Sequence, residues 1–204
     1  MIDYQAVLRR VPAQPVANDL TGLIDDLKQE WLRAYDDMTD AVNSVHLVER
    51  GQFSFLFDLS CEIAHEHDRE IQDDRVVVFF GTSLPATDKR DSARMRGFVG
   101  PTTMTFGAKY DKGHFISHAA GGGTLDAVNW FPQLRAINRG WSERGKVYRA
   151  MERYCADNPG TFFFSRPIYD YPPPTRRSWT PCALEYGVLR DDRLWVETFD
   201  NLSR

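Results

Sequence analysis

Apolar residues recur at three- and four-residue steps between positions 20 and 45, with acidic side chains between them. This period is that of an amphipathic helix with one buried face. Asn18 or Thr21 stands where a capping residue would begin such a helix. The preceding residues 1–17 hold two prolines and show no clear period, which predicts an extended arm. The apolar face of the predicted helix consists of Leu20, Leu23, Ile24, Leu27, Trp31, Tyr35, Met38 and Val42.

Strand patterns follow the predicted helix. Residues 52–60 alternate apolar and polar side chains, which predicts a strand with one face made of Phe53, Phe55, Phe57 and Leu59. A short apolar run that ends in a glycine predicts a buried strand over 75–81. The remaining strands are predicted over 102–110 and 161–169, and a hairpin over 183–199 with its turn at 190–193.

The central segment, residues 111–160, changes its pattern three times. HFISHAA is typical of a strand, and Gly121–Gly123 can adopt the positive φ angles of a tight connection. Residues 124–131 can form the returning strand, which Pro132 would end. A helix can then begin at Asn138 or Ser142 and stop at 158–160. The segment therefore predicts a strand, a turn, a second strand and a helix in about fifty residues.

Length and composition indicate a single soluble domain over residues 1–204. Apolar residues make up 42% of the chain, which is enough for a hydrophobic core, and no run approaches the ~18 apolar residues of a membrane helix. The N-terminus has no apolar signal-peptide region. The three cysteines show no CxxC spacing, which favours a reducing compartment and argues against a zinc site. We therefore expect a cytoplasmic protein, or an effector that a dedicated machine delivers, with no membrane partner.

Charge is distributed unevenly along the chain. The net charge is −4, but residues 1–75 carry 16 acidic and 7 basic side chains, whereas residues 76–204 carry 13 acidic and 18 basic ones. An anionic partner is therefore expected to meet the second part of the chain. A solvated surface without a partner is the alternative reading of the same charges.

Four short motifs in the central segment occur in a specific order. They are DKGHFISH, VNWFPQ, INRGW and YRAME, which all fall within residues 109–155. In this order they resemble the DNA/RNA non-specific endonucleases of the ββα-metal (His-Me finger) nuclease class. The resemblance covers about a quarter of the chain. It implies an α+β fold in which an antiparallel sheet carries a ββα-metal catalytic core at 109–155, with an N-terminal arm and helix over 1–50.

The resemblance also implies roles for individual residues. His114 would be the general base, since an imidazole with an ordinary pKa of about 6.5 can accept a proton from water at neutral pH. Asn138 would ligate one Mg²⁺ ion, for which Mn²⁺ can substitute, because Mg²⁺ keeps most of its waters and needs few protein oxygens. Asn129 would hold the site together by hydrogen bonds. The expected phosphate contacts are Lys112, Arg135 and Arg139.

Two features depart from the pattern of this class. Lys112 stands where an arginine is usual, which keeps the charge but loses the bidentate fork. The glutamate expected to hold a metal-bound water is best matched by Glu152, yet it follows Asn138 by fourteen residues, about 21 Å along a continuous helix. Either residues 142–147 form an insertion with Gly145 as its hinge, or Glu143 takes the role. The motif favours Glu152.

Other candidate residues have simpler explanations. A lone histidine on a strand is more often structural than catalytic, and only the downstream asparagines favour His114 as a base. His118, on the same predicted strand face, is interpreted as structural or as a partner of the site. The His65–His67 stretch has no third ligand nearby and is typical of a polar surface. The resemblance also implies an upstream arginine that contacts the transition-state phosphate, for which Arg94 and Arg96 are candidates that no motif separates.

The sequence therefore predicts a Mg²⁺-dependent endonuclease that cleaves DNA with low sequence specificity, and leaves cleavage of RNA open. One alternative is a catalytically inactive nuclease-like module that binds nucleic acid or another protein. Another is a sequence-restricted homing or restriction-type enzyme. A toxin, which would be accompanied by an immunity or complex partner protein, a defence nuclease and a housekeeping enzyme are all compatible with the same residues.

Overall fold

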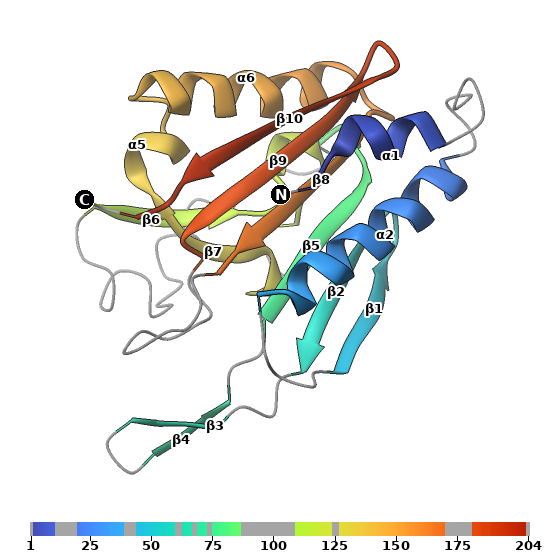
Figure 1. The fold of residues 1–204 in the computed structure, drawn as a ribbon. Coiled ribbons are helices and arrows are strands. Elements are labelled where there is room, and N and C mark those ends of the chain that lie inside the picture. Colours follow the sequence, from blue (N-terminus) through green and yellow to red (C-terminus); the bar gives the residue numbers. More distant parts are fainter. Residues whose placement is uncertain are drawn as a thin grey trace.

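A six-stranded antiparallel sheet forms the centre of the protein (Figure 1). The computed structural model describes residues 2–10, 20–38, 44–59, 63–66, 69–72, 75–86, 109–123, 127–169 and 181–202. Within these residues the strand order is β1-β2-β5-β8-β9-β10, and each neighbouring pair is antiparallel. The mixture of this sheet with helices confirms the predicted α+β class. The strands are β1 (Ser44–Arg50), β2 (Phe53–Leu59), β5 (Arg75–Thr82), β8 (Phe162–Ile168), β9 (Ala183–Arg190) and β10 (Arg193–Asp200).

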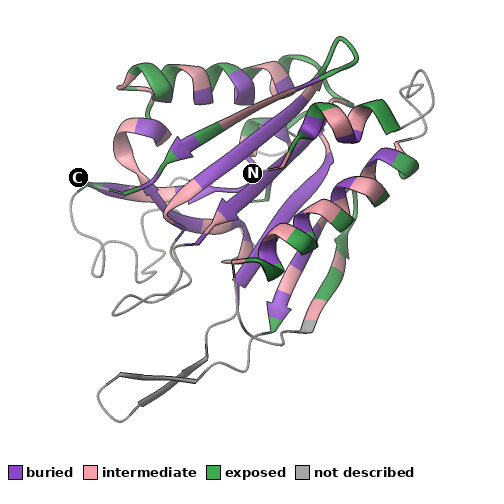
Figure 2. Ribbon diagram, viewed as in Figure 1, coloured by how far each residue is buried: buried purple, intermediate pink, exposed green. Residues whose placement is uncertain are grey.

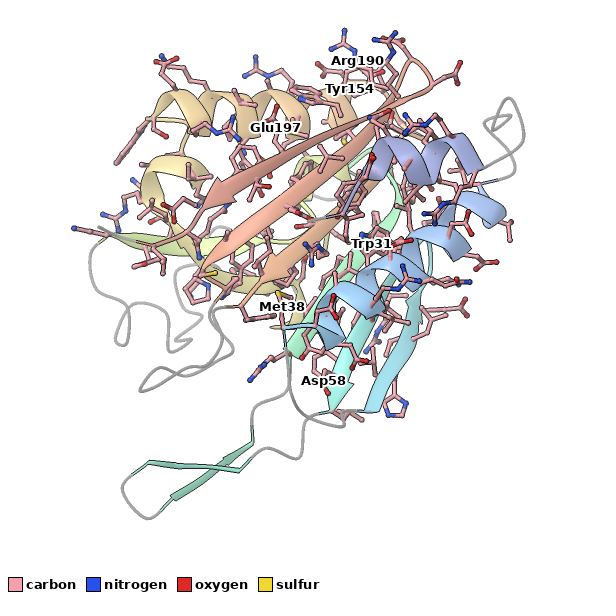
Figure 3. The ribbon with its side chains drawn as sticks, viewed as in Figure 1. Trp31, Met38, Asp58, Tyr154, Arg190 and Glu197 are labelled. Carbon is pink, nitrogen blue, oxygen red and sulfur yellow. The ribbon has the colours of Figure 1, made fainter. Side chains whose placement is uncertain are left out.

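Two helices cover one face of the sheet, α1 (Tyr4–Arg10) and α2 (Thr21–Asp36) (Figure 1). The buried stripe of α2 matches the predicted period, and Trp31 packs on the rings of Phe80 and Phe164 with centroids 5.5 and 5.0 Å apart (Figure 3). Tertiary packing rather than a side-chain cap holds the start of α2, since its N-cap residue is Leu20. Its buried residues are Leu23, Leu27, Trp31 and Tyr35.

The N-terminal predictions were wrong at two points. The predicted arm contains the helix α1, whose buried side chains are Tyr4 and Val7. Two apolar residues one turn apart are too few to reveal a period, so only contact with the sheet distinguishes this helix from a loop. The predicted helix over 20–45 ends at Asp36, and an edge strand, β1, begins at Ser44.

The opposite face of the sheet carries the central segment. It forms a two-stranded antiparallel ribbon of β6 (Tyr110–His114) and β7 (Trp130–Leu134), followed by α5 (Arg135–Asn138) and α6 (Glu143–Asp157). Two single turns of 3₁₀ helix, η1 (His118–Ala120) and η2 (Ala127–Asn129), lie between the two strands. Figure 2 shows the buried residues concentrated in the middle strands, between the two covering layers. The core on this side includes Phe79, Phe115, Phe131, Tyr148, Met151 and Tyr186.

The order strand, strand, helix is as predicted, but the boundaries differ. The first strand stops at His114, so the rest of HFISHAA, including His118, does not continue it. Pro132 lies inside β7, opposite Lys112, and does not end the returning strand. A proline is tolerated there because the position does not need an N–H bond to β6: the Pro132 carbonyl oxygen points to the other edge of β7, where it accepts a hydrogen bond from Nδ2 of Asn201 at 2.8 Å.

The helix after the ribbon is broken rather than continuous. Asn138 ends α5 instead of opening a long helix. Gly140 has a φ of 69°, and α6 then begins after Ser142, whose hydroxyl accepts a hydrogen bond from the Gly145 N–H at 3.0 Å. The hinge is therefore Gly140 and not Gly145. A Cβ on Gly145 would lie 2.3 Å from the Ala136 carbonyl oxygen, so this glycine permits close packing of α6 on α5.

Of the other predicted strands, some are present as predicted and one differs in detail. The strands over 75–81 and 161–169 and the hairpin over 183–199 are present, and the hairpin turn holds Asp191 and Asp192 at positive φ. In β2 the register with β5 shifts between Leu56 and Phe57. The predicted single face is therefore interrupted, and Leu59 is exposed.

Several predictions fall outside the described residues. They include most of the strand over 102–110, His67, Arg94 and Arg96. The hairpin of β3 (Ile63–Glu66) and β4 (Arg69–Gln72) contains His65, about whose side chain nothing is described. In the described part of the chain, each helix is too short or too polar to cross a lipid bilayer.

Candidate active site

Gly113 and His114 lie at the end of β6, where the ribbon meets the core. Gly113 faces β7, and a Cβ on it would approach the Gln133 Cβ to 2.4 Å. The close approach of the Gln133 side chain on the neighbouring strand therefore requires a glycine at this position. The ring of His114 is buried and packs on the ring of its cross-strand neighbour Trp130, with centroids 4.6 Å apart.

Lys112 belongs to the same cluster as His114. Alternate residues of a strand face the same side, so Lys112 and His114 share a face of β6. The ammonium of Lys112 lies 5.9 Å from the centre of the Trp130 ring. Partial burial lowers the pKa of Lys112 from its ordinary value. Trp130 thus contacts both residues and limits how their side chains can move.

Asn129 fixes the connection between the two strands. Its side-chain oxygen Oδ1 accepts a hydrogen bond from the Ile116 N–H at 2.8 Å. Its amide Nδ2 donates to the carbonyl oxygens of Ile116 at 3.0 Å and of Gly123 at 3.3 Å. Its own carbonyl accepts from the Phe115 N–H at 3.1 Å. The side chain of Asn129 therefore holds the chain that leaves His114.

The two arginines expected to contact phosphate both bind Asp111 on β6. Arg135 donates through Nε to Oδ1 of Asp111 at 2.9 Å. Arg139 donates through Nε to Oδ2 and through Nη2 to Oδ1, at 2.5 and 3.0 Å. Partial burial opposes ionisation of Asp111, but the hydrogen bonds from Arg139 and Arg135 outweigh it and lower the pKa of Asp111. The carboxylate neutralises one of the two guanidinium groups.

Sequence reasoning missed Asp111 as a site residue. The signal was present, since an aspartate next to a lysine in a basic part of the chain has cations available as partners. The sequence does not indicate that α5 folds back beside β6. This packing brings both arginines to the carboxylate of Asp111.

Asn138 lies on the same side of α5 as these arginines. Positions 135, 138 and 139 are three and four residues apart, which places them on one face of a helix. Asn138 is partly exposed, and among the residues that the structure describes its side chain has no hydrogen-bond partner. Its amide oxygen is therefore available to a ligand.

Glu152 is buried on α6 and contacts β6, the strand of His114, indirectly through Tyr148. It forms an ion pair with Arg149 at 2.5 Å. It also lies beside the hydroxyl of Tyr148, and burial together with the charge of Glu152 raises the pKa of Tyr148 well above its ordinary value. That hydroxyl donates to the carbonyl oxygen of His114 at 3.5 Å. Glu143, by contrast, is exposed and pairs with Lys146.

The donor groups decide which metal ion these residues could hold. The described residues contain no group of three or more His, Cys, Asp or Glu side chains that could hold a metal ion, so they offer no zinc-type or calcium-type cage. The available Asn138 amide supplies one neutral oxygen. A single oxygen of this kind could contact Mg²⁺, which commonly retains several of its waters.

No protein-family model matches the chain, and no curated protein matches it. The chain is similar to two solved structures of NucA from Streptococcus agalactiae. One has a magnesium ion bound, with 16% identity, a TM-score of 0.37 and coverage of 81% of this chain and 75% of the other. The second has no metal bound, with 16% identity, a TM-score of 0.36 and coverage of 81% and 74%. Similarity this low does not establish a family.

Proposed function

We propose that this protein is a Mg²⁺-dependent endonuclease that hydrolyses phosphodiester bonds with low sequence specificity. The observation that carries the proposal is the corner at which β6 meets α5. There Asp111 of β6 holds Arg135 and Arg139, the available amide of Asn138 lies on the same helix face, and Lys112 and His114 follow on the other face of the same short strand. Together these groups can supply a general base, a metal ligand and charges that stabilise the transition state of phosphodiester hydrolysis.

His114 is proposed to take a proton from the attacking water. A neutral imidazole can do so near pH 7, and such a positioned base typically contributes ~10²–10⁴-fold to the rate. Trp130 packs against the ring and holds its orientation. Asn129 fixes the chain that follows His114 and so keeps the end of β6 in place. Both are positioning residues in this proposal, because neither is assigned a contact with the substrate.

Asn138 is proposed to bind the ion, and the cations to bind the substrate phosphates. A bound Mg²⁺ would offset the negative charge that develops on the phosphorus oxygens and on the leaving oxygen. Lys112, Arg135 and Arg139 would hold the polynucleotide backbone, which carries no sequence information and so gives low specificity. Glu152 would act indirectly, through its contacts with Arg149 and Tyr148.

One experiment tests the proposal. Purified protein is incubated with supercoiled plasmid and, separately, with RNA, in Mg²⁺, in Mn²⁺ and in EDTA. We expect nicked and linear plasmid in either metal and intact plasmid in EDTA. Intact plasmid and intact RNA under all conditions would overturn the proposal. Cleavage of only one substrate decides between DNA and RNA.

A second candidate function is binding without cleavage. It is favoured by the ion pairs already present, since Arg135 and Arg139 bind Asp111 and Glu152 binds Arg149. Retarded but uncut plasmid in a mobility-shift gel with Mg²⁺ would support this function instead. The roles of toxin, defence nuclease and housekeeping enzyme, and the immunity partner of a toxin, stay predictions.

A further inference from the structure

Trp141 is the most exposed of the large apolar side chains that the structure describes. Its exposed fraction is 65%, against 47% for the next, Leu47. It lies between the hinge Gly140 and the helix cap Ser142, directly after the α5 turn that carries Asn138 and Arg139. Burial of an indole against a ligand is favourable, so an exposed tryptophan beside a candidate site is a candidate for a ligand contact.

The backbone under Trp141 is held rigidly. The Trp141 N–H donates to the Ala136 carbonyl oxygen at 2.9 Å, and the Ser142 N–H donates to the same oxygen at 3.3 Å. The positive φ of Gly140 sets the direction in which the chain leaves α5. The position of the Trp141 Cα relative to α5 is therefore determined by the fold and not by the side chain itself.

The indole ring is also held in place. The guanidinium of Arg139 lies 5.0 Å from the centre of the Trp141 ring, within the range of a cation–π contact. Arg139 is itself fixed by its two hydrogen bonds to Asp111. A flat aromatic surface, with a cation against it and most of its area open to solvent, is thus presented beside Asn138.

We propose that Trp141 stacks against an unpaired nucleobase, so that the protein binds single-stranded nucleic acid at this corner. The inference rests on the proposed function and names its substrate class. Bases in a duplex are covered above and below by their neighbours, so an aromatic side chain reaches a base face only when the base is unpaired. Asp111 neutralises one of the three cations Lys112, Arg135 and Arg139, which leaves positive charge for the backbone phosphates on either side of the stacked base.

Binding is measured without cleavage, by fluorescence anisotropy in EDTA. The probes are a labelled oligothymidylate of about twelve nucleotides, an abasic strand of the same length and charge, and the matching duplex. The variants are Trp141→Ala and Trp141→Leu, which keeps apolar area but has no aromatic face. Leu47→Ala, an exposed apolar residue on the edge strand β1, is the matched control. Thermal unfolding checks that each variant is folded.

We expect wild-type protein to bind the oligothymidylate more tightly than the abasic strand and the duplex. Both Trp141 variants should weaken oligothymidylate binding by roughly 5- to 150-fold, the contribution of one stacked base, and leave abasic-strand binding unchanged. Leu47→Ala should bind every probe as wild type does.

Three results would overturn the inference. They are wild-type affinity for oligothymidylate in Trp141→Leu, equal losses on the oligothymidylate and abasic strands, and no binding of the oligothymidylate by wild-type protein. The plasmid assay separates this test from the proposed function. A protein that cuts plasmid while Trp141→Ala binds as wild type refutes the stacking alone. A protein that cuts nothing, while Trp141→Ala loses only oligothymidylate binding, refutes the nuclease alone.

Discussion

On the sheet face covered by α1 and α2, buried carboxylates meet buried partners. Glu185 accepts hydrogen bonds from Tyr4 at 2.5 Å and from Arg166 at 2.7 Å, and the side chain of Arg166 is 6% exposed. Asp58, labelled in Figure 3, is fully buried and accepts from the Tyr35 hydroxyl. Burial raises the pKa of Tyr4 and of Tyr35, so both hydroxyls keep their protons and remain donors.

On the face covered by the ribbon, α5 and α6, acidic side chains pair with arginines that reach the solvent. The partner of Glu152 is Arg149, whose side chain is 50% exposed, and Arg139, a partner of Asp111, is 46% exposed. Glu197 on β10 pairs with Arg144 of α6 (Figure 3). The comparison shows that a fully buried ion pair, Arg166 with Glu185, lies on the first face, whereas the arginines paired on the second face remain about half exposed.

The largest expected effect concerns the second face alone. His114→Ala should lower plasmid cleavage by ~10²–10⁴-fold, because the proposed base is gone, and should leave duplex binding intact. His46→Ala, a histidine exposed on β1, is the matched control and should cleave normally. Initial rates on supercoiled plasmid, with unfolding curves for each variant, measure the effect. Near wild-type cleavage by His114→Ala would show that His114 is not the general base. His118 would then be the next candidate.

A second prediction compares how much an ion pair on each face of the sheet contributes to the free energy of unfolding. Glu185→Gln should lower the free energy of unfolding by about 3–5 kcal/mol, because it leaves the buried guanidinium of Arg166 without its counter-charge. Glu197→Gln, which leaves a half-exposed arginine in water, should cost far less. Urea unfolding followed by circular dichroism measures both. Equal decreases in the free energy of unfolding for Glu185→Gln and Glu197→Gln would contradict the proposed difference between the two faces.

A matched double variant sharpens this stability test. Glu185→Gln combined with Arg166→Met removes both charges and should recover part of the loss. If the double variant were as unstable as the single one, the cost would come from packing and not from the unpaired charge.

A third prediction ranks the residues near the proposed ion. Asn138→Ala should need much more Mg²⁺ for half-maximal cleavage, because it removes the direct ligand. Glu152→Gln should raise that requirement ~10–100-fold, as expected of a group that acts through its neighbours. Glu143→Gln should be nearly silent, since Glu143 is exposed and contacts Lys146. Titration of Mg²⁺ against initial rate measures all three. A large effect of Glu143→Gln with a silent Glu152→Gln would reverse the assignment.

A fourth prediction concerns the exposed guanidinium groups. If Arg135 and Arg139 contact phosphates, replacing either with Gln should reduce the slope of log K against log salt for duplex binding by about 0.9. Arg193→Gln, at the exposed β9–β10 turn, should leave the slope unchanged. Binding titrations at several salt concentrations give the slopes. Unchanged slopes for the Arg135→Gln and Arg139→Gln variants would show that neither arginine contacts a phosphate and that both pair with Asp111 alone.

The smallest expected effect is on the pH dependence of stability. The pKa of Asp111 is lowered below its ordinary value of 3.8 in the folded protein, so the bridge stabilises the fold above that pH. The stabilisation should be lost as the pH falls through the lower, folded-state pKa. Asp111→Asn should therefore be slightly less stable than wild type at pH 7, and the two proteins should converge in acid. Unfolding midpoints measured against pH test this, and a constant difference in acid would contradict it.

Much of the sheet could be predicted from local sequence. The apolar run of β5, the turn residues Asp191 and Asp192, and the periodic face of α2 carry information within a few neighbouring positions. For the candidate site, short motifs indicate residue types, and the roles of those residues stay predictions. His114, Asn129 and Asn138 were named from short motifs, and the structure places them on the ribbon, its connection and the following helix.

Contacts between segments that are distant in the sequence determined the features that local patterns did not predict. The helix α1 is held on the sheet by contacts with residues far along the chain, such as the hydrogen bond from Tyr4 to Glu185. The break at Gly140, the pairing of Asp111 with two arginines of α5 and the exposure of Trp141 all depend on how α5 packs against β6 and α6. Sequence periodicity reports which face of an element is apolar. It does not report which element covers that face, because burial and charge pairing are determined by neighbours that only the tertiary fold brings together.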